Sequence, residues 1–139
     1  MPVPSEYQRA SLDFDKFMVD ARDIAGLATT NMAWNMVVGV LHTFRRRLDV
    51  RDAARFANVL PPVLRAIFVA NWNTDEPRLP FGDWVAMTKE VQALRAAHNF
   101  APDTAIHDVA TALRRNINEE DLDRVLAELP EGAVAFWRV

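Results

Sequence analysis

The chain has 139 residues, of which half are apolar and a quarter are charged, so it fits one compact globular domain and lacks the composition of a disordered protein. The absence of cysteine excludes disulfides, thiolate metal ligands and a cysteine nucleophile. No stretch resembles a signal peptide or approaches the roughly 20 apolar residues that span a bilayer, so we expect a cytoplasmic protein without membrane contact.

The first part of the chain predicts two helices separated by a glycine. Asp13 is placed to cap the first helix, whose apolar residues recur at helical spacing from Phe14 onward, and Gly26 is expected to end it. Thr29 or Thr30 should open the second helix. His42 falls opposite the apolar stripe of that helix, so we expect it to be exposed. The stripe consists of Val37, Val40, Leu41, Phe44 and Leu48.

Two shorter helices and a linker are predicted next. Asp49 is expected to cap a third helix, which Pro61 and Pro62 should end because proline disrupts a helix interior. Pro62 suits the first turn of a short fourth helix that reaches Phe68. The segment 73–80, NTDEPRLP, is polar and contains two prolines, and it predicts a linker.

The second half of the chain follows the same order of elements. A helix begins near Trp84, Asp103 is expected to cap the next helix and Asn118 the one after it. Pro130 should end that helix, and a short final helix is expected over residues 134–137. No segment combines apolar and polar alternation with hairpin signals, so an all-α fold is predicted.

An internal repeat explains this recurrence. Shifting the sequence by 69 residues aligns residues 40–68 with residues 109–137. The repeat predicts two pseudo-symmetric four-helix units, about residues 14–72 and 81–139, packed as one domain over residues 1–139. The first unit has eight Lys/Arg and five Asp/Glu and the second has six and ten, so their net charges are +3 and −4. Identical pairs include Arg45/Arg114, Arg46/Arg115, Asp52/Asp121, Arg55/Arg124, Leu60/Leu129, Pro61/Pro130 and Ala66/Ala135.

These motifs resemble an uncharacterised bacterial family, the domain of unknown function 2267. The resemblance is carried by the Arg45-Arg46 pair, by Leu60-Pro61-Pro62 and by LPEGAVAFW from Leu129, and it covers nearly the whole chain. It implies two helical copies, each with an arginine-rich helix end and a Leu-Pro step before a short helix. It implies no established activity, cofactor or catalytic residues.

The residues that commonly carry chemistry form no catalytic or metal-binding pattern. The only two serines lie in the amino-terminal arm, and the four glycines are too scattered to form a phosphate-binding loop. Asp103 and His107 share a helix face that His98 could join around Zn²⁺ or Fe, but Asp103 is better used as a cap and solvated or hydrogen-bonded histidines are favoured. The carboxylates of residues 119–123 follow a cap, where the helix dipole favours negative charge. We predict no enzymatic activity, no cofactor and no bound metal.

A run of arginines is the strongest functional candidate in the sequence. Arg45, Arg46 and Arg47 close one helix and Arg51 and Arg55 lie on the next, so the turn between them predicts a candidate interaction or anion-binding surface. Three of these have counterparts in the second unit, which indicates a role in the fold, either pairing with Asp52 and Asp121 or covering helix carbonyls. Arg47 and Arg51 have none, so we expect them on the surface, where changing both to Glu should alter association with little loss of folding.

An aromatic residue extends this candidate surface. Trp34 lies at the flank of its helical stripe, and large rings are mostly buried, so the core is the expected place for it. The same core placement is expected for most of Trp72, Trp84 and Trp137. An exposed ring at Trp34 would instead mark an interface.

Four functions follow from these observations, in decreasing order of preference. The first is a non-enzymatic helical scaffold or protein-interaction module with an unknown protein partner, which could be a homodimer. The second is a small-ligand or anion-binding protein that uses a cleft between the two repeats near Arg47 and Arg51. An enzyme with side chains gathered from distant positions is the third, and nucleic-acid binding through the arginines is disfavoured by the acidic balance of the chain. A polar pocket between the repeats would favour the second function, and a continuous apolar patch the first.

Overall fold

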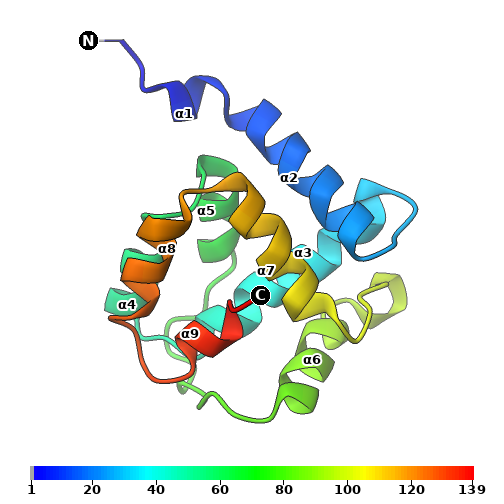
Figure 1. Cartoon of the computed structure of the whole chain (residues 1–139). Helices are drawn as coiled ribbons and strands as arrows, with labels where there is room; N and C mark the ends of the chain where they lie inside the picture. The colour runs from blue at the N-terminus through cyan, green and yellow to red at the C-terminus, as the bar shows by residue number, and fades with distance from the viewer. Residues whose placement is uncertain (1) are drawn as a thin grey trace.

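A computed structural model describes residues 2–139, and within them the chain is all-helical, as predicted, with no strand. No helix in this range is long and apolar enough to cross a membrane. The helices are α1 Ser5–Gln8, α2 Ala10–Ile24, α3 Thr30–Arg45, α4 Val50–Ala57, α5 Pro62–Val69, α6 Trp84–Ala93, α7 Ala105–Asn116, α8 Glu119–Leu126 and α9 Ala133–Phe136, with a 3-10 turn η1 at Ala96–His98 (Figure 1).

Most of the predicted helix boundaries are confirmed by hydrogen bonds. The Thr29 hydroxyl, the Asp49 carboxylate and the Asn118 amide oxygen each accept a hydrogen bond from the backbone N–H three residues later. Gly26 has a φ of 70° and ends α2, because the left-handed region costs glycine little. Pro62 occupies the first turn of α5, where its missing N–H has no intrahelical partner.

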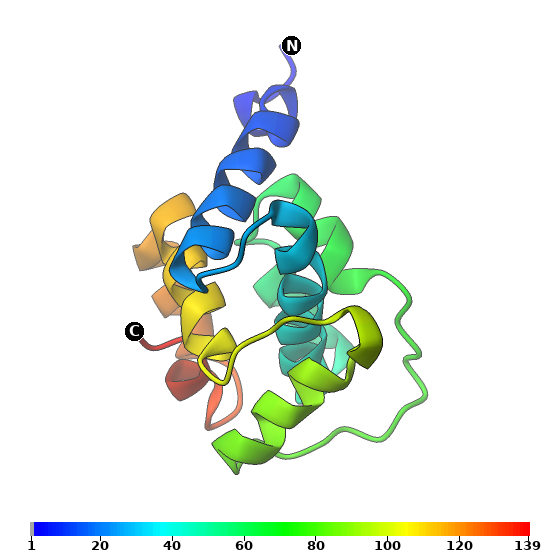
Figure 2. The same cartoon turned by 90° about the vertical axis from the view of Figure 1, so that its right-hand side faces the viewer.

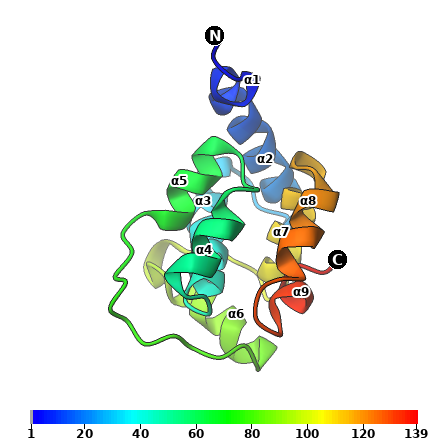
Figure 3. The same cartoon turned by 90° about the vertical axis from the view of Figure 1, so that its left-hand side faces the viewer.

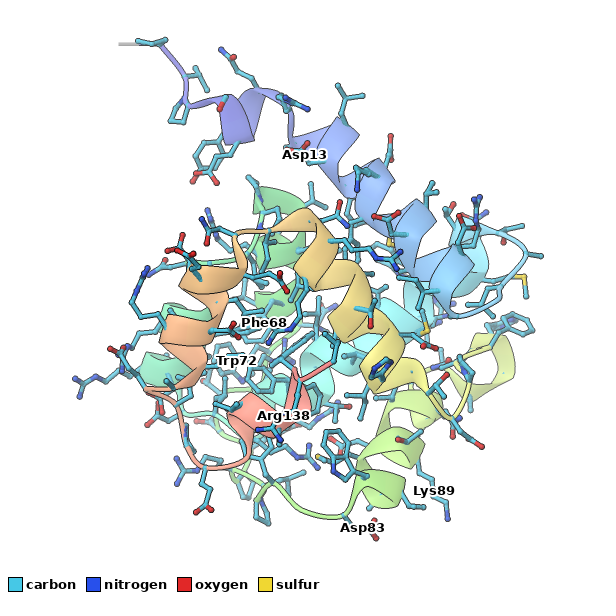
Figure 4. All side chains as sticks on the ribbon, in the orientation of Figure 1. Asp13, Phe68, Trp72, Asp83, Lys89 and Arg138 are labelled. Carbon is cyan, nitrogen blue, oxygen red and sulfur yellow. The ribbon has the colours of Figure 1, made fainter. Side chains whose placement is uncertain are left out.

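Two predicted caps are wrong. Helix α2 begins at Ala10, so Asp13 lies within its first turn, on the part of the helix that projects beyond the body of the molecule in Figure 4. There its carboxylate forms an ion pair with Arg9, at 3.8 Å. Helix α7 has Thr104 at its cap position without a side-chain cap bond, while Asp103 accepts a hydrogen bond from Gln92 across the preceding loop. In both cases another residue occupies the cap position, Arg9 for α2 and Thr104 for α7.

The helices of the two halves are paired reciprocally. Helix α2 packs against α7, α6 packs against α3, and α4 contacts its counterpart α8. Helices α4 and α8 also begin and end 69 residues apart, and Figure 3 shows α4 and α5 facing α8 and α9 across the molecule. In a two-fold arrangement, if one element contacts another then their counterparts make the same contact. The packing therefore has the pattern of a two-fold relation, while superposition of the halves stays a prediction.

Aromatic rings from both halves fill one shared core. The Phe44 ring lies 4.7 Å from that of Phe56 and 5.0 Å from that of Phe136, and Phe56 stacks on Trp137 at 5.6 Å. Each of these four side chains is almost completely buried. Because both halves contribute to the same aromatic cluster, neither half has a complete core of its own.

The segment between α5 and α6 runs as an irregular strap along the outside of the body, as Figure 2 shows. The linker predicted over residues 73–80 is confirmed as this non-helical, exposed segment. It is attached to the end of α3 at Leu79, whose N–H donates to the Arg46 carbonyl at 3.0 Å. The strap thereby closes one side of the space beside α3.

Candidate binding groove

The five arginines do not form a single positive surface. Arg45 and Arg47 are buried, Arg46 is half-buried, and only Arg51 is exposed. Arg55 is half-buried and pairs with Glu128 and, at 3.9 Å, with Asp52. The structure therefore offers no single face on which all five arginines could contact an anion or a nucleic acid.

Arg47 corrects a prediction, because it is buried instead of lying on the surface. Its side chain is 6% exposed, and its two terminal nitrogens bind both carboxylate oxygens of Glu90 on α6, at 3.0 and 2.8 Å. Arg46 shares the same carboxylate at 3.0 Å. A bidentate arginine–carboxylate pair holds a defined geometry, so Arg47 joins the end of α3 to α6 and is unavailable to an external partner.

Arg45 confirms the prediction that a repeated arginine covers helix carbonyls. It is 4% exposed, and its Nη1 atom donates to the carbonyls of Phe68 and Ala70 at the end of α5, both at 2.8 Å. Its guanidinium lies 5.2 Å from the Trp72 ring centre, in cation–π range. Phe68 and Trp72 are labelled in Figure 4. Arg124 likewise pairs with Asp121, at 2.6 Å, as the repeat predicted.

The charge of Arg45 is not neutralised by any ion pair in the described part of the chain. Its Nε atom is buried and has no hydrogen-bond partner. Burial, with a smaller effect from Arg46, lowers the pKa of Arg45 to about 10, although Glu76 acts in the opposite direction. At neutral pH the side chain is therefore still a buried cation, which is costly without an anion nearby.

A groove of about 540 Å³ opens beside Arg45. Its walls are α3 and α5, the strap between α5 and α6, and the end of α6, so both halves contribute to it. Its lining includes neither Arg47 nor Arg51, near which a cleft between the repeats is predicted, and a smaller hollow of about 210 Å³ lies at the turn of Leu48, Asp49 and Val50. The lining residues are Trp34, Asn35, Val38, His42, Arg45, Arg46, Val63, Ala66, Ile67, Ala70, Asn71, Asn73, Glu76, Leu94 and Arg95.

His42 lies in this groove and is buried, which corrects the predicted exposure. It is 7% exposed because α5 packs against α3 and covers the face of α3 opposite the apolar stripe. Its Nε2 atom lies 2.9 Å from the Ile67 carbonyl, and since a carbonyl only accepts, Nε2 carries the hydrogen. Burial lowers the pKa of His42, and Arg45 and Arg46 lower it further against the opposing effect of this hydrogen bond. The imidazole is thus held in its neutral form.

Trp34 stands at the rim of the groove and is exposed, not in the core as expected. Its exposed fraction is 41%, and its ring meets the ring of Phe14 edge-on, with centroids 6.3 Å apart. Trp84 is exposed as well and Trp72 is half-buried, so Trp137 alone among the four is a core residue. An exposed indole beside a groove is typical of an interface.

Two rim residues have a backbone that is uncommon for their type. Asn71, after α5, has a φ of 54°, and Arg95, after α6, has a φ of 48°. The left-handed region costs a non-glycine residue about 1 kcal/mol or more. Both residues follow the end of a helix and line the groove. Asparagine just after a helix is a signal for a left-handed residue, so Asn71 could have been predicted, whereas nothing in the sequence marks Arg95.

The described residues contain no group of three or more His, Cys, Asp or Glu side chains able to hold a metal ion. His98 and His107 are both exposed. The groove offers arginine, histidine and asparagine side chains around an apolar floor, an arrangement suited to binding. The predicted absence of a bound metal and of a cofactor remains to be measured.

Residues 14–136 match a protein family described as "Uncharacterized conserved protein (DUF2267)". A search of curated proteins gave no significant match.

Proposed function

The chain belongs to the DUF2267 family, which is uncharacterised, and we propose from the groove itself that this protein is a non-enzymatic interaction module. Its partner is an apolar protein segment that carries acidic side chains and docks beside α3 and α5. A reducing cytoplasm suits a chain without cysteine, and the proposal places the protein there.

The observation that carries this proposal is the composition and openness of the groove. Val38, Val63, Ile67 and Leu94 supply an apolar lining, and the rim residues Trp34, Ala66, Asn71 and Arg95 are exposed to solvent. A site for a small molecule usually encloses most of its ligand. A groove that is open along its rim and bordered by tryptophan and arginine instead has the composition of a protein interface.

Charge favours an acidic partner. Arg45, Arg46 and Arg95 line the groove, whereas Glu76 is its one acidic lining residue. His42 is neutral there because of its lowered pKa. Complementary charge speeds encounter and selects among partners more than it adds affinity.

A display library of random linear peptides tests the proposal. Peptides selected on the wild-type protein should combine apolar and acidic residues, and their binding should shift amide signals of α3 and α5 in NMR spectra. Ala66→Trp places a large ring in the groove from an exposed position and should abolish binding. The control is Ala127→Trp, exposed at the end of α8 and outside the groove, which should bind normally.

Selected peptides that bind Ala66→Trp as well as wild type would refute docking in the groove. The small-ligand function would be favoured if no peptide is enriched and a small organic anion binds tightly to the wild-type protein but not to Ala66→Trp. A concentration-dependent dimer that Ala66→Trp disrupts would identify a second copy of the chain as the occupant.

A further inference from the structure

We infer that Arg45 is a carboxylate receptor, which binds an Asp or Glu side chain of the segment docked in the groove. This inference rests on the proposed function and names the contact that recognises the partner. Its basis is a comparison of Arg45 with the matching arginine of the second half.

In the second half, Arg114 uses all three nitrogens of its guanidinium. Nε donates to the Trp137 carbonyl at 2.8 Å, Nη1 lies 3.4 Å from Glu119, and Nη2 lies 2.9 Å from Asp123. Trp137 is the counterpart of Phe68, whose carbonyl Arg45 binds. The two arginines therefore bind carbonyls at corresponding helix ends, Arg45 at the end of α5 and Arg114 at the end of α9. Arg114 is also neutralised by two carboxylates of α8.

The first half has no such carboxylates. The positions that correspond to Glu119 and Asp123 are Val50 and Ala54, both exposed on α4. Arg45 accordingly binds carbonyls through Nη1 alone, and its buried Nε has no partner. Glu76 lines the same groove and acts to raise the pKa of Arg45, but among the described residues it forms no ion pair with that guanidinium.

The missing negative charge is therefore expected from outside the chain. Arg45 lines the groove, so a carboxylate that enters there meets a guanidinium already fixed by two carbonyls and by Trp72. A preorganised, partly desolvated arginine binds a carboxylate more strongly than a flexible surface arginine does. The carboxylate is the chosen ligand because carboxylates are what the matching Arg114 holds.

The test supplies the missing carboxylates internally. The double variant Val50→Glu/Ala54→Asp gives Arg45 the partners that Arg114 has, and both positions are exposed, so the fold should be retained. The matched control Val50→Gln/Ala54→Asn has the same size without the charge. Each protein is titrated with one wild-type-selected peptide and with the same peptide in which each Glu becomes Gln and each Asp becomes Asn.

The neutralised peptide should bind wild type and the Gln/Asn control about tenfold more weakly or worse than the acidic peptide. The Glu/Asp variant should bind the acidic peptide as weakly as the neutralised one, yet still bind both through the apolar groove. Equal preference for the acidic peptide in all three proteins would overturn the role of Arg45 while leaving docking in the groove intact. Loss of the docking proposal itself would show separately, as binding that Ala66→Trp does not affect.

Discussion

Three consecutive arginines at the end of α3 meet three different environments. Arg45 binds the carbonyls of α5, Arg46 is half-buried beside Glu90, and Arg47 is buried against that carboxylate. Arg45 thus faces α5, whereas Arg46 and Arg47 both reach Glu90 on α6. Which elements these side chains contact depends on the tertiary structure and cannot be predicted from three consecutive arginines.

Removing the carboxylate beneath Arg47 should destabilise the protein strongly. Glu90→Ala leaves a buried guanidinium without its anion, and we expect a loss of about 3 kcal/mol in the free energy of unfolding. Urea denaturation measures it. Replacing both partners by apolar residues, Arg47→Met with Glu90→Leu, should recover much of the loss because the buried guanidinium of Arg47 is then no longer left without its anion.

Arg51→Glu serves as the surface comparison for that experiment. Arg51 is exposed and should change stability by no more than about 0.5 kcal/mol. Arg47→Glu, in contrast, sets a second carboxylate against Glu90 and should prevent stable folding. Equal stability of the Arg47→Glu and Arg51→Glu variants would contradict the buried ion pair.

His42 should make stability depend on pH between the ordinary histidine value of 6.5 and its own lowered pKa. Below pH 6.5 the unfolded chain takes up a proton that the folded chain does not, so the free energy of unfolding falls as the pH falls through this window. His42→Gln keeps a donor for the Ile67 carbonyl without titrating. Its stability should therefore decline less than that of wild type between pH 7 and about 5.

Urea denaturation at each pH measures the free energy of unfolding. If this free energy changes with pH in parallel for wild type and His42→Gln, the result would contradict a neutral buried imidazole.

Asp20 does not interfere in this pH window. Burial opposes the shift, but hydrogen bonds from Asn116 and Lys16 lower its pKa below 3.8, so its effect on stability appears only in stronger acid.

Helix boundaries could be predicted from local chemistry, whereas the position of the groove on the surface could not. Thr29, Asp49 and Asn118 cap helices as predicted because the bond that each makes is confined to its own turn. Asp13 and Asp103 are not caps because α2 already begins at Ala10 and Thr104 occupies the cap position of α7. The position of the groove could not be predicted because its walls come from α3, α5, the strap and the end of α6, and sequence periodicity does not show how these elements are arranged.

The crossing of α3 and α6 depends on Gly39. A Cβ atom added there would lie 2.8 Å from the Val91 carbonyl oxygen, and backbone cannot move aside cheaply. We expect Gly39→Ala to cost about 1–3 kcal/mol through overpacking, more than the roughly 1 kcal/mol that alanine gains in helix propensity. Thermal unfolding followed by circular dichroism measures the change.

Gly82 is the control for this substitution. A Cβ there meets nothing within 4 Å, and its φ is not positive, so Gly82→Ala should leave stability unchanged or slightly raised. A Gly39→Ala variant as stable as Gly82→Ala would show that α3 and α6 do not approach as closely as described.

At the scale of the whole molecule, the reciprocal packing of α2 on α7 and α6 on α3 makes each half dependent on the other. Fragments 1–76 and 77–139, divided within the exposed strap, should each be largely unfolded alone. Mixed together they should regain helical structure, because the aromatic core needs Phe44 and Phe56 from one fragment and Phe136 and Trp137 from the other. Circular dichroism of each fragment and of the mixture tests this, and cooperative unfolding of either fragment by itself would contradict it.

The strap between α5 and α6 also decides whether the second half folds back onto its own chain or onto a neighbour. The same contacts of α2 with α7 and α3 with α6 form in either case, so a domain-swapped dimer would bury no new surface and need no new interface. Deleting residues 73–78 should make the return path too short and shift the protein from monomer to exchanged dimer in light scattering, while its helix content stays the same. The length of an exposed, irregular segment would thereby set the number of chains in the folded particle.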